Sequence, residues 1–142
     1  MDNSPEMVKV MNEKIKKTKA GNLKVVNFDL EHSHYDGEKF DFIFTQMVLH
    51  HVNDIEGIIN RFKSILNQGG YLAIADLYEE DGSFHGEGFT GHMGFNPESL
   101  SGILKRNQFK NISHKLCFVI DRKITVAESK KFEVFLMVAE RI

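Results

Sequence analysis

Short apolar runs alternate with a helical pattern along most of this chain, and this alternation restricts its fold more than any other feature. Three runs read as strands because they are short and rich in apolar and β-branched residues: Leu23–Phe28, Phe40–Phe44 and Tyr71–Ala75. Between the last two, Ile55–Leu66 repeats apolar residues at helical spacing. A strand–helix–strand order predicts an α/β fold, a mostly parallel Rossmann-like sheet with helices on both faces. The run Phe40–Phe44, apolar except for Asp41, indicates a central strand.

The second half of the chain adds a helix and a hairpin to this plan. Asn96-Pro97-Glu98 is a typical helix start, and Asn53 is the expected cap of the preceding helix. Two closing strands, Asn111–Ile120 and Phe132–Glu140, flank a polar stretch. Their order predicts a C-terminal antiparallel hairpin at one end of the sheet.

The chain opens with Met1-Asp2-Asn3-Ser4-Pro5, an acidic loop followed at once by a helix start. Ser4 is a good N-cap and Gly21 a natural stop for this helix. Such a loop normally follows a strand, so we expect residues 1–142 to form a single partial domain without its first βαβ unit. Asp2, as the second residue, is expected to fray.

Composition restricts the partners and the compartment. The formal net charge of -2 gives no attraction to nucleic acid or to an anionic membrane, and no apolar run reaches the ~18 residues of a membrane helix. The one cysteine, Cys117, excludes an internal disulfide and suits the cytoplasm. Because it stands between Leu116 and Phe118, it is expected to be a buried structural thiol.

Four stretches together resemble the class I methyltransferases that use S-adenosylmethionine, in their small-molecule branch. They are, in chain order, Asp2-Asn3-Ser4-Pro5-Glu6-Met7, Asn27-Phe28-Asp29-Leu30, Phe40 through the Leu49-His50-His51 turn, and Phe62 through Leu66-Asn67-Gln68-Gly69-Gly70 to Tyr71. Gln68 stands where the family usually has proline. The family's glycine-rich loop after its first strand, and its first two strands, have no counterpart.

The resemblance implies a set of residues that bind S-adenosylmethionine. Asp2, with Asn3, matches the acidic loop that accepts hydrogen bonds from the ribose hydroxyls. Asp29 and Leu30 match the adenine contacts, although Asp29 also fits an ordinary acidic loop. The resemblance also implies that the turn after Phe40–Phe44 lines the methionine portion of the cofactor. Its residues are Thr45, Gln46 and Met47. A simple strand-to-helix turn would explain these residues nearly as well.

Histidines are the candidate catalytic residues. His51 is expected near the methyl-transfer pocket, with a packing histidine as the rival interpretation. His85 and His92 lie in the glycine-rich stretch Glu79–Gly94, which can close over a small acceptor and present a base to its proton. Acids beside this loop either orient a cationic substrate or only solvate the loop: Asp76, Glu79, Glu80 and Asp81.

Metal binding is the lesser interpretation of these histidines. His50 and His51 are adjacent, so we expect that they do not both face one ion. His32 and His34 have no nearby residues that complete a ligand set. The sequence therefore predicts no metal site.

The resemblance implies transfer of a methyl group from S-adenosylmethionine to a small-molecule acceptor. The alternative is a non-catalytic binding or assembly protein that keeps the scaffold. In the family's sheet the absent strands lie beside Phe40–Phe44, so their loss exposes an apolar edge. We expect that edge to pair with a second copy, to be covered by the chain's own first strand, or to require an upstream segment.

Overall fold

The computed structural model describes residues 1–125 and 128–142, and its contacts divide the chain into two compact units. The first is Met1–Asp36 and the second is Gly37–Ile142. The single domain expected from the sequence stays a prediction.

The first unit contains one helix, α1 (Pro5–Thr18). It begins as predicted, because the Ser4 side chain accepts a hydrogen bond from the backbone N–H of Met7 at 3.2 Å. It ends earlier than Gly21, since Lys19 adopts a left-handed conformation with φ 53° and closes the last turn. None of its residues is buried.

The strand predicted at Leu23–Phe28 is wrong. The only β-type pairing described in this segment is one isolated parallel bridge between Asp2 and Asn27. A strand exists through a ladder of hydrogen bonds to its neighbours, and a single bridge does not extend into one. The apolar pattern of Leu23–Phe28 therefore has no sheet to join within this unit.

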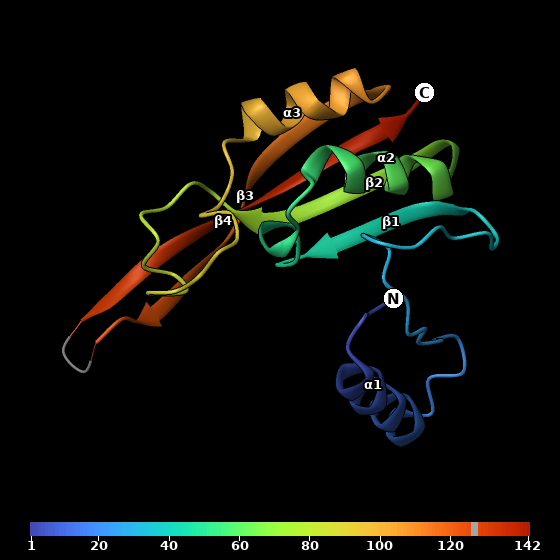
Figure 1. Ribbon diagram of the computed structural model, residues 1–142, viewed down its shortest axis with the longest axis horizontal. Helices are drawn as coiled ribbons and strands as arrows, with labels where there is room; N and C mark the ends of the chain where they lie inside the picture. The colour runs from blue at the N-terminus through green and yellow to red at the C-terminus, as the bar shows by residue number, and fades with distance from the viewer. Residues whose placement is uncertain (126–127) are drawn as a thin grey trace. The chain divides into compact units, whose positions relative to one another are not determined.

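The second unit is built on a four-stranded sheet with the order β1-β2-β4-β3 (Figure 1). Its strands are β1 (Phe40–Gln46), β2 (Leu66–Leu77), β3 (Phe109–Lys123) and β4 (Ser129–Arg141). β1 and β2 run parallel, whereas β4 runs antiparallel to both β2 and β3. The α/β class and the C-terminal hairpin are confirmed. The described sheet is mainly antiparallel, because no further parallel strand joins β1.

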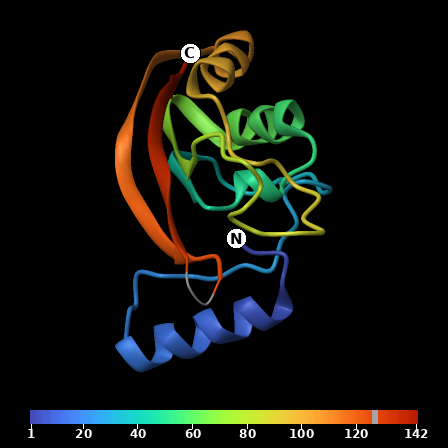
Figure 2. The same cartoon turned by 90° about the vertical axis from the view of Figure 1, so that its left-hand side faces the viewer.

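The helices of this unit, α2 (Ile55–Ile65) and α3 (Pro97–Arg106), lie on the same face of the sheet (Figure 2). The prediction placed helices on both faces, so the unit differs from it here. Asn96 caps α3 as predicted, but α2 is capped by Asp54 rather than Asn53. The core between these helices and the sheet contains Ile58, Ile59, Phe62, Ile65, Leu72, Ile74, Leu100 and Leu104.

β1 forms one edge of the described sheet, although its apolar sequence predicted a central strand. Phe42 and Phe44 are 59% and 52% exposed, and Tyr71, the register partner of Phe42 on β2, is 45% exposed. These three rings share the face without helices, since alternate residues of a strand point the same way. Within this unit, the apolar residues of β1 therefore lie on an exposed sheet face and along an edge to which no described strand pairs.

Cys117 is exposed, so its prediction as a buried thiol is wrong. It lies in the mostly exposed middle of β3, beside an irregularity in the pairing with β4.

Within residues 1–125 and 128–142, the structure shows no helix with the length and apolar character needed to cross a membrane.

Candidate active site

Three imidazoles meet where the parallel pair of strands ends. His50 and His51 belong to η1 (Leu49–His51), the short 3-10 helix that follows β1. His85 comes from the loop that follows β2. One ring nitrogen of each histidine lies within 4.8 Å of one from each of the others. We call this group the histidine cluster.

A buried carboxylate anchors the cluster. Oδ1 of Asp76 lies 2.6 Å from Nδ1 of His50, and both side chains are almost inaccessible to solvent. A carboxylate only accepts hydrogen bonds, so Nδ1 donates and Nε2 of His50 is the nitrogen that remains. Backbone N–H groups of His50 and Leu77 also donate to Asp76, at 3.3 and 2.8 Å.

Sequence reasoning missed this role of Asp76, which it grouped with loop acids. The available signal was position, because the residue directly follows the apolar run Tyr71–Ala75. A carboxylate in a strand that is buried on both sides needs a partner inside the protein. The sequence likewise does not single out His50, whose only visible feature is its neighbour His51.

The loop after β2 is held against η1 by its backbone. The N–H of His92 donates to the carbonyl oxygen of His50 at 2.8 Å. At Gly91 an added Cβ would stand only 2.3 Å from that same oxygen, so only glycine permits this approach. The ring of His92 lies beside Phe95, with centroids 5.3 Å apart, and is not a member of the cluster.

The ring of His85 is fixed by aromatic contacts. It stacks on Phe89 with ring centroids 3.9 Å apart and planes 14° apart, and Phe84 meets it edge-on at 4.9 Å. Its Nε2 is buried and has no hydrogen-bond partner among the described residues. Burial, and then the electrostatic interaction with His50, lower the pKa of both His85 and His51 below the usual histidine value.

The sequence predicts that His50 and His51 do not both face one ion, yet the structure brings their rings together. The ring centroids of His50 and His51 lie 4.2 Å apart, with the planes tilted by 42°. The spacing rule holds for regular α-helices, whereas η1 is a single 3-10 turn with one ring held by Asp76. The tight turn and the anchor together allow both rings to reach His85.

The cofactor residues predicted after β1 lie at its carboxyl end. Thr45 and Gln46 are still ladder residues, in register with Ile74 and Ala75 of β2, so only Met47 follows the strand. Met47 has φ 52°, unusual for a residue with a side chain, and its N–H donates to the carbonyl oxygen of Ala75 at 2.9 Å. Such strained turns are frequent at ligand sites.

The remaining predicted cofactor residues lie in the first unit. Asp2 is hydrogen-bonded on three sides: its N–H donates to Val26, its carbonyl oxygen accepts from Phe28, and its Oδ1 accepts from Ser4. Asn3 is exposed beside it. The bridge between Asp2 and Asn27 brings the two acidic loops of this unit side by side.

Asp29 organises the second of these loops. Its Oδ1 accepts from the backbone N–H groups of Glu31 and His32, at 3.0 and 3.1 Å, and Leu30 lies within the turn. Its Oδ2 lies 3.1 Å from Nδ1 of His32, and this contact, before the others, lowers the pKa of Asp29. A carboxylate offers about four acceptor positions, so capacity remains for another donor.

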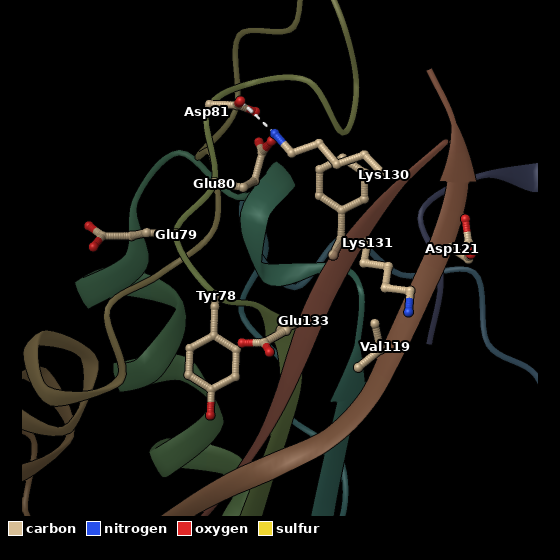
Figure 3. Close-up of a pocket in the computed structure, with 10 residues that line it drawn as sticks. Tyr78, Glu79, Glu80, Asp81, Val119, Asp121, Lys130, Lys131 and Glu133 are labelled. Carbon is tan, nitrogen blue, oxygen red and sulfur yellow. Dashed lines mark hydrogen bonds and ion pairs between the residues drawn. The ribbon is translucent and has the colours of Figure 1, made fainter. Parts of the chain in front are cut away.

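An open pocket of about 660 Å³ lies near the tip of the hairpin (Figure 3). It is lined by Tyr78–Asp81, Val119, Asp121 and Lys130–Glu133. Figure 3 shows the Lys130 side chain reaching Asp81, with which it forms an ion pair. Phe132, on the pocket wall, meets Phe84 edge-on at 5.0 Å, so Phe84 contacts both the pocket wall and His85.

Comparison with known proteins identifies relatives. A family model described as a methyltransferase domain matches residues 1–74. An uncharacterized methyltransferase of Schizosaccharomyces pombe is 28% identical over 127 residues, which cover 78% of this chain and 45% of the relative. The chain thus spans less than half the length of that relative.

Solved structures share the fold. A SAM-dependent methyltransferase from Aquifex aeolicus is similar with TM-score 0.68 and 19% identity, covering 99% of this chain and 66% of the other. A methyltransferase from Bacillus halodurans gives TM-score 0.75 and 14% identity, covering 99% and 80%. An N-methyltransferase from Bradyrhizobium japonicum, solved with S-adenosyl-l-homocysteine, gives TM-score 0.64 and 17% identity, covering 99% and 64%.

Proposed function

The chain belongs to the methyltransferase domain family, and from this premise we propose that it transfers a methyl group from S-adenosylmethionine to a small-molecule acceptor. The observation that carries the proposal is the bridge between Asp2 and Asn27, which holds Asp2 and the Asp29 loop next to each other. Two neighbouring acidic loops suit the adenosine half of the cofactor, which presents a ribose diol and an amino group as donors.

The residues present fit the adenosine half of S-adenosylmethionine. Asp2 keeps Oδ2 for the ribose hydroxyls after Oδ1 has accepted from Ser4. Asn3 stands beside it, and Asp29 with Leu30 would take the adenine ring. In the second unit the end of β1, at Thr45, Gln46 and the strained Met47, would serve the methionine portion.

When bound, S-adenosylmethionine supplies a methyl group on a positively charged sulfur, which is already activated for displacement. The protein's residues therefore contribute alignment, exclusion of water and a base for the acceptor's proton. We assign the base to His51 or His85, since both rings lie in the histidine cluster at the end of the parallel strands. His92 lies outside the cluster, and it stays a candidate base only because it belongs to the same loop as His85.

Titration with S-adenosylhomocysteine tests the cofactor assignment. Loss of a hydrogen bond to a charged group costs about 1.5 to 3 kcal/mol, so Asp2→Asn and Asp29→Asn should each weaken binding about 10- to 150-fold. Asp36→Asn is the matched control in the same unit, because its exposed carboxylate pairs with the equally exposed His34. Absence of binding, or equal binding by all variants, would refute the assignment.

The exposed edge of β1 supports a second role in assembly. An unpaired apolar strand edge favours pairing with another chain, and β1 pairs only with β2 among the described strands. We propose that two copies associate through β1. Light scattering should show a dimer that Phe44→Lys converts to monomer, whereas Val10→Lys on α1 should not; a wild-type monomer at every concentration would contradict this role.

We also propose that the protein resides in the cytoplasm. The exposed free thiol of Cys117 supports this, since exposed thiols persist in reducing compartments. Fractionation of cells that carry the tagged protein is the test, and recovery outside the cytoplasmic fraction would oppose the proposal.

A further inference from the structure

We propose that His50, His51 and His85 form a binding site for a divalent transition metal of the zinc type. Imidazole nitrogen is a preferred ligand of Zn²⁺, and three protein ligands with an open fourth position are typical of reactive zinc sites. The proposal concerns metal binding and does not depend on the methyl-transfer function.

The first support is convergence. The three candidate nitrogens all lie within 4.8 Å of one another, and they come from two segments separated by more than thirty residues of sequence. Tetrahedral zinc with Zn–N bonds of about 2.1 Å requires nitrogens about 3.4 Å apart. His51 is exposed, so its ring has room to rotate toward the shorter spacing.

The second support is the orientation of His50. Metal-bound histidines usually donate their other ring nitrogen to a carboxylate, which sets the tautomer and holds the ring. Asp76 does this at 2.6 Å, in a position that is fully buried. Nε2 of His50 is thereby left as an acceptor with its lone pair available to a metal.

The third support is the buried Nε2 of His85, which has no partner among the described residues. A buried polar atom without a hydrogen bond is costly, and a metal ion is one of the few groups that would satisfy it. Phe84 and Phe89 pack against this ring and reduce its contact with water. An apolar surround of this kind controls the access of solvent to a metal site.

The exposure of His51 determines the type of site. Because one ligand faces solvent, the fourth coordination position is open to water or to a small molecule carrying oxygen, nitrogen or sulfur. Hard ions such as Mg²⁺ prefer oxygen ligands and would not compete. A lone pair cannot hold a metal and a proton together, so the base role assigned to His51 or His85 belongs to the zinc-free protein, and bound zinc would block it.

Calorimetric titration of the chelator-treated protein with Zn²⁺ tests the proposal directly. We expect one zinc per chain, no heat from Mg²⁺, and a visible absorption band of tetrahedral cobalt when Co²⁺ replaces zinc. A wild-type protein that binds no zinc would overturn the proposal.

Variants separate the cluster from other histidines. His51→Gln and His85→Gln should each weaken zinc binding beyond the about 10- to 100-fold that loss of an outer hydrogen bond costs. His114→Gln, an exposed residue on β3, removes the same side chain elsewhere and should bind zinc within about twofold of wild type. Retained binding in both cluster variants, or equal loss in His114→Gln, would overturn the site.

Separate control measurements are needed for folding and for cofactor binding. Circular dichroism checks each variant, and the exposed position of His51 makes its replacement safe even where His85→Gln fails to fold. Titration of the same proteins with S-adenosylhomocysteine distinguishes the two proposals. Zinc binding without cofactor binding would refute the methyl-transfer function alone, and the reverse result would refute the metal site alone.

Discussion

The backbone of Gly91 lies against the carbonyl oxygen of His50, so close that a Cβ at position 91 would stand 2.3 Å from that oxygen. The next residue, His92, donates its N–H to the same oxygen at 2.8 Å. This contact ties the loop after β2 to the turn after β1. The same loop carries His85, whose ring lies beside those of His50 and His51.

Gly91→Ala should destabilise the protein by about 1 to 3 kcal/mol, the usual cost of forcing an added methyl group into a packed site. It should also weaken zinc binding, because the loop that carries His85 must move. Urea denaturation measures the stability. Gly102→Ala in α3 is the matched control, since its nearest atom would be 3.7 Å away and alanine favours a helix. Equal effects of the two changes would contradict the role of the close approach.

Asp76→Ala should cost about 3 kcal/mol or more of unfolding free energy, because it leaves Nδ1 of His50 buried without a partner. Chemical denaturation at neutral pH checks this. Glu79→Ala, an exposed acid in the following loop, should change stability by less than about 0.5 kcal/mol. A mild effect at Asp76 would show that the pair does not hold the turn.

The contact between Asp81 and Lys130 should make stability depend on pH in acid. Hydrogen bonds from Lys130, and then from Ser83, hold the pKa of Asp81 well below its ordinary value of 3.8. The stabilisation is therefore complete above that value and is lost as the pH falls from it toward the lower pKa of the folded state. Above pH 5, Asp81→Asn should lower the denaturation midpoint, and the difference from wild type should shrink toward pH 2.

Lys131→Met is the control for this pH series, since it removes a lysine at the adjacent position. Its midpoint should follow the wild-type pH dependence. A difference between wild type and Asp81→Asn that stays constant from pH 6 to pH 2 would show that the ion pair does not set the acid response.

Cys117 should react with a chromogenic disulfide reagent in the native protein, because the structure exposes this side chain. One thiol per chain is expected without denaturant, and none in Cys117→Ser. The substitution should change stability by less than about 0.5 kcal/mol. A thiol that reacts only after unfolding would support burial instead.

The sequence predicted the elements that depend on local signals. The caps at Ser4 and Asn96, the buried face of Ile55–Leu66 and the closing hairpin follow from capping chemistry and periodicity. The prediction of a strand at Leu23–Phe28 was wrong because an extended segment becomes a strand only when a neighbouring strand forms a ladder of hydrogen bonds with it. The prediction that Cys117 is buried was wrong because the apolar neighbours of a strand residue do not reveal whether a helix covers it.

The sequence by itself determined which residue types were available: acids after predicted strands, and histidines in a turn and in a glycine-rich loop. Tertiary structure decided which of them meet. Asp76 pairs with His50 across 26 positions, and His85 joins them through a loop whose docking depends on Gly91. Such contacts arise because parallel strands end at one edge of a sheet and bring distant turns together, and no local pattern records that convergence.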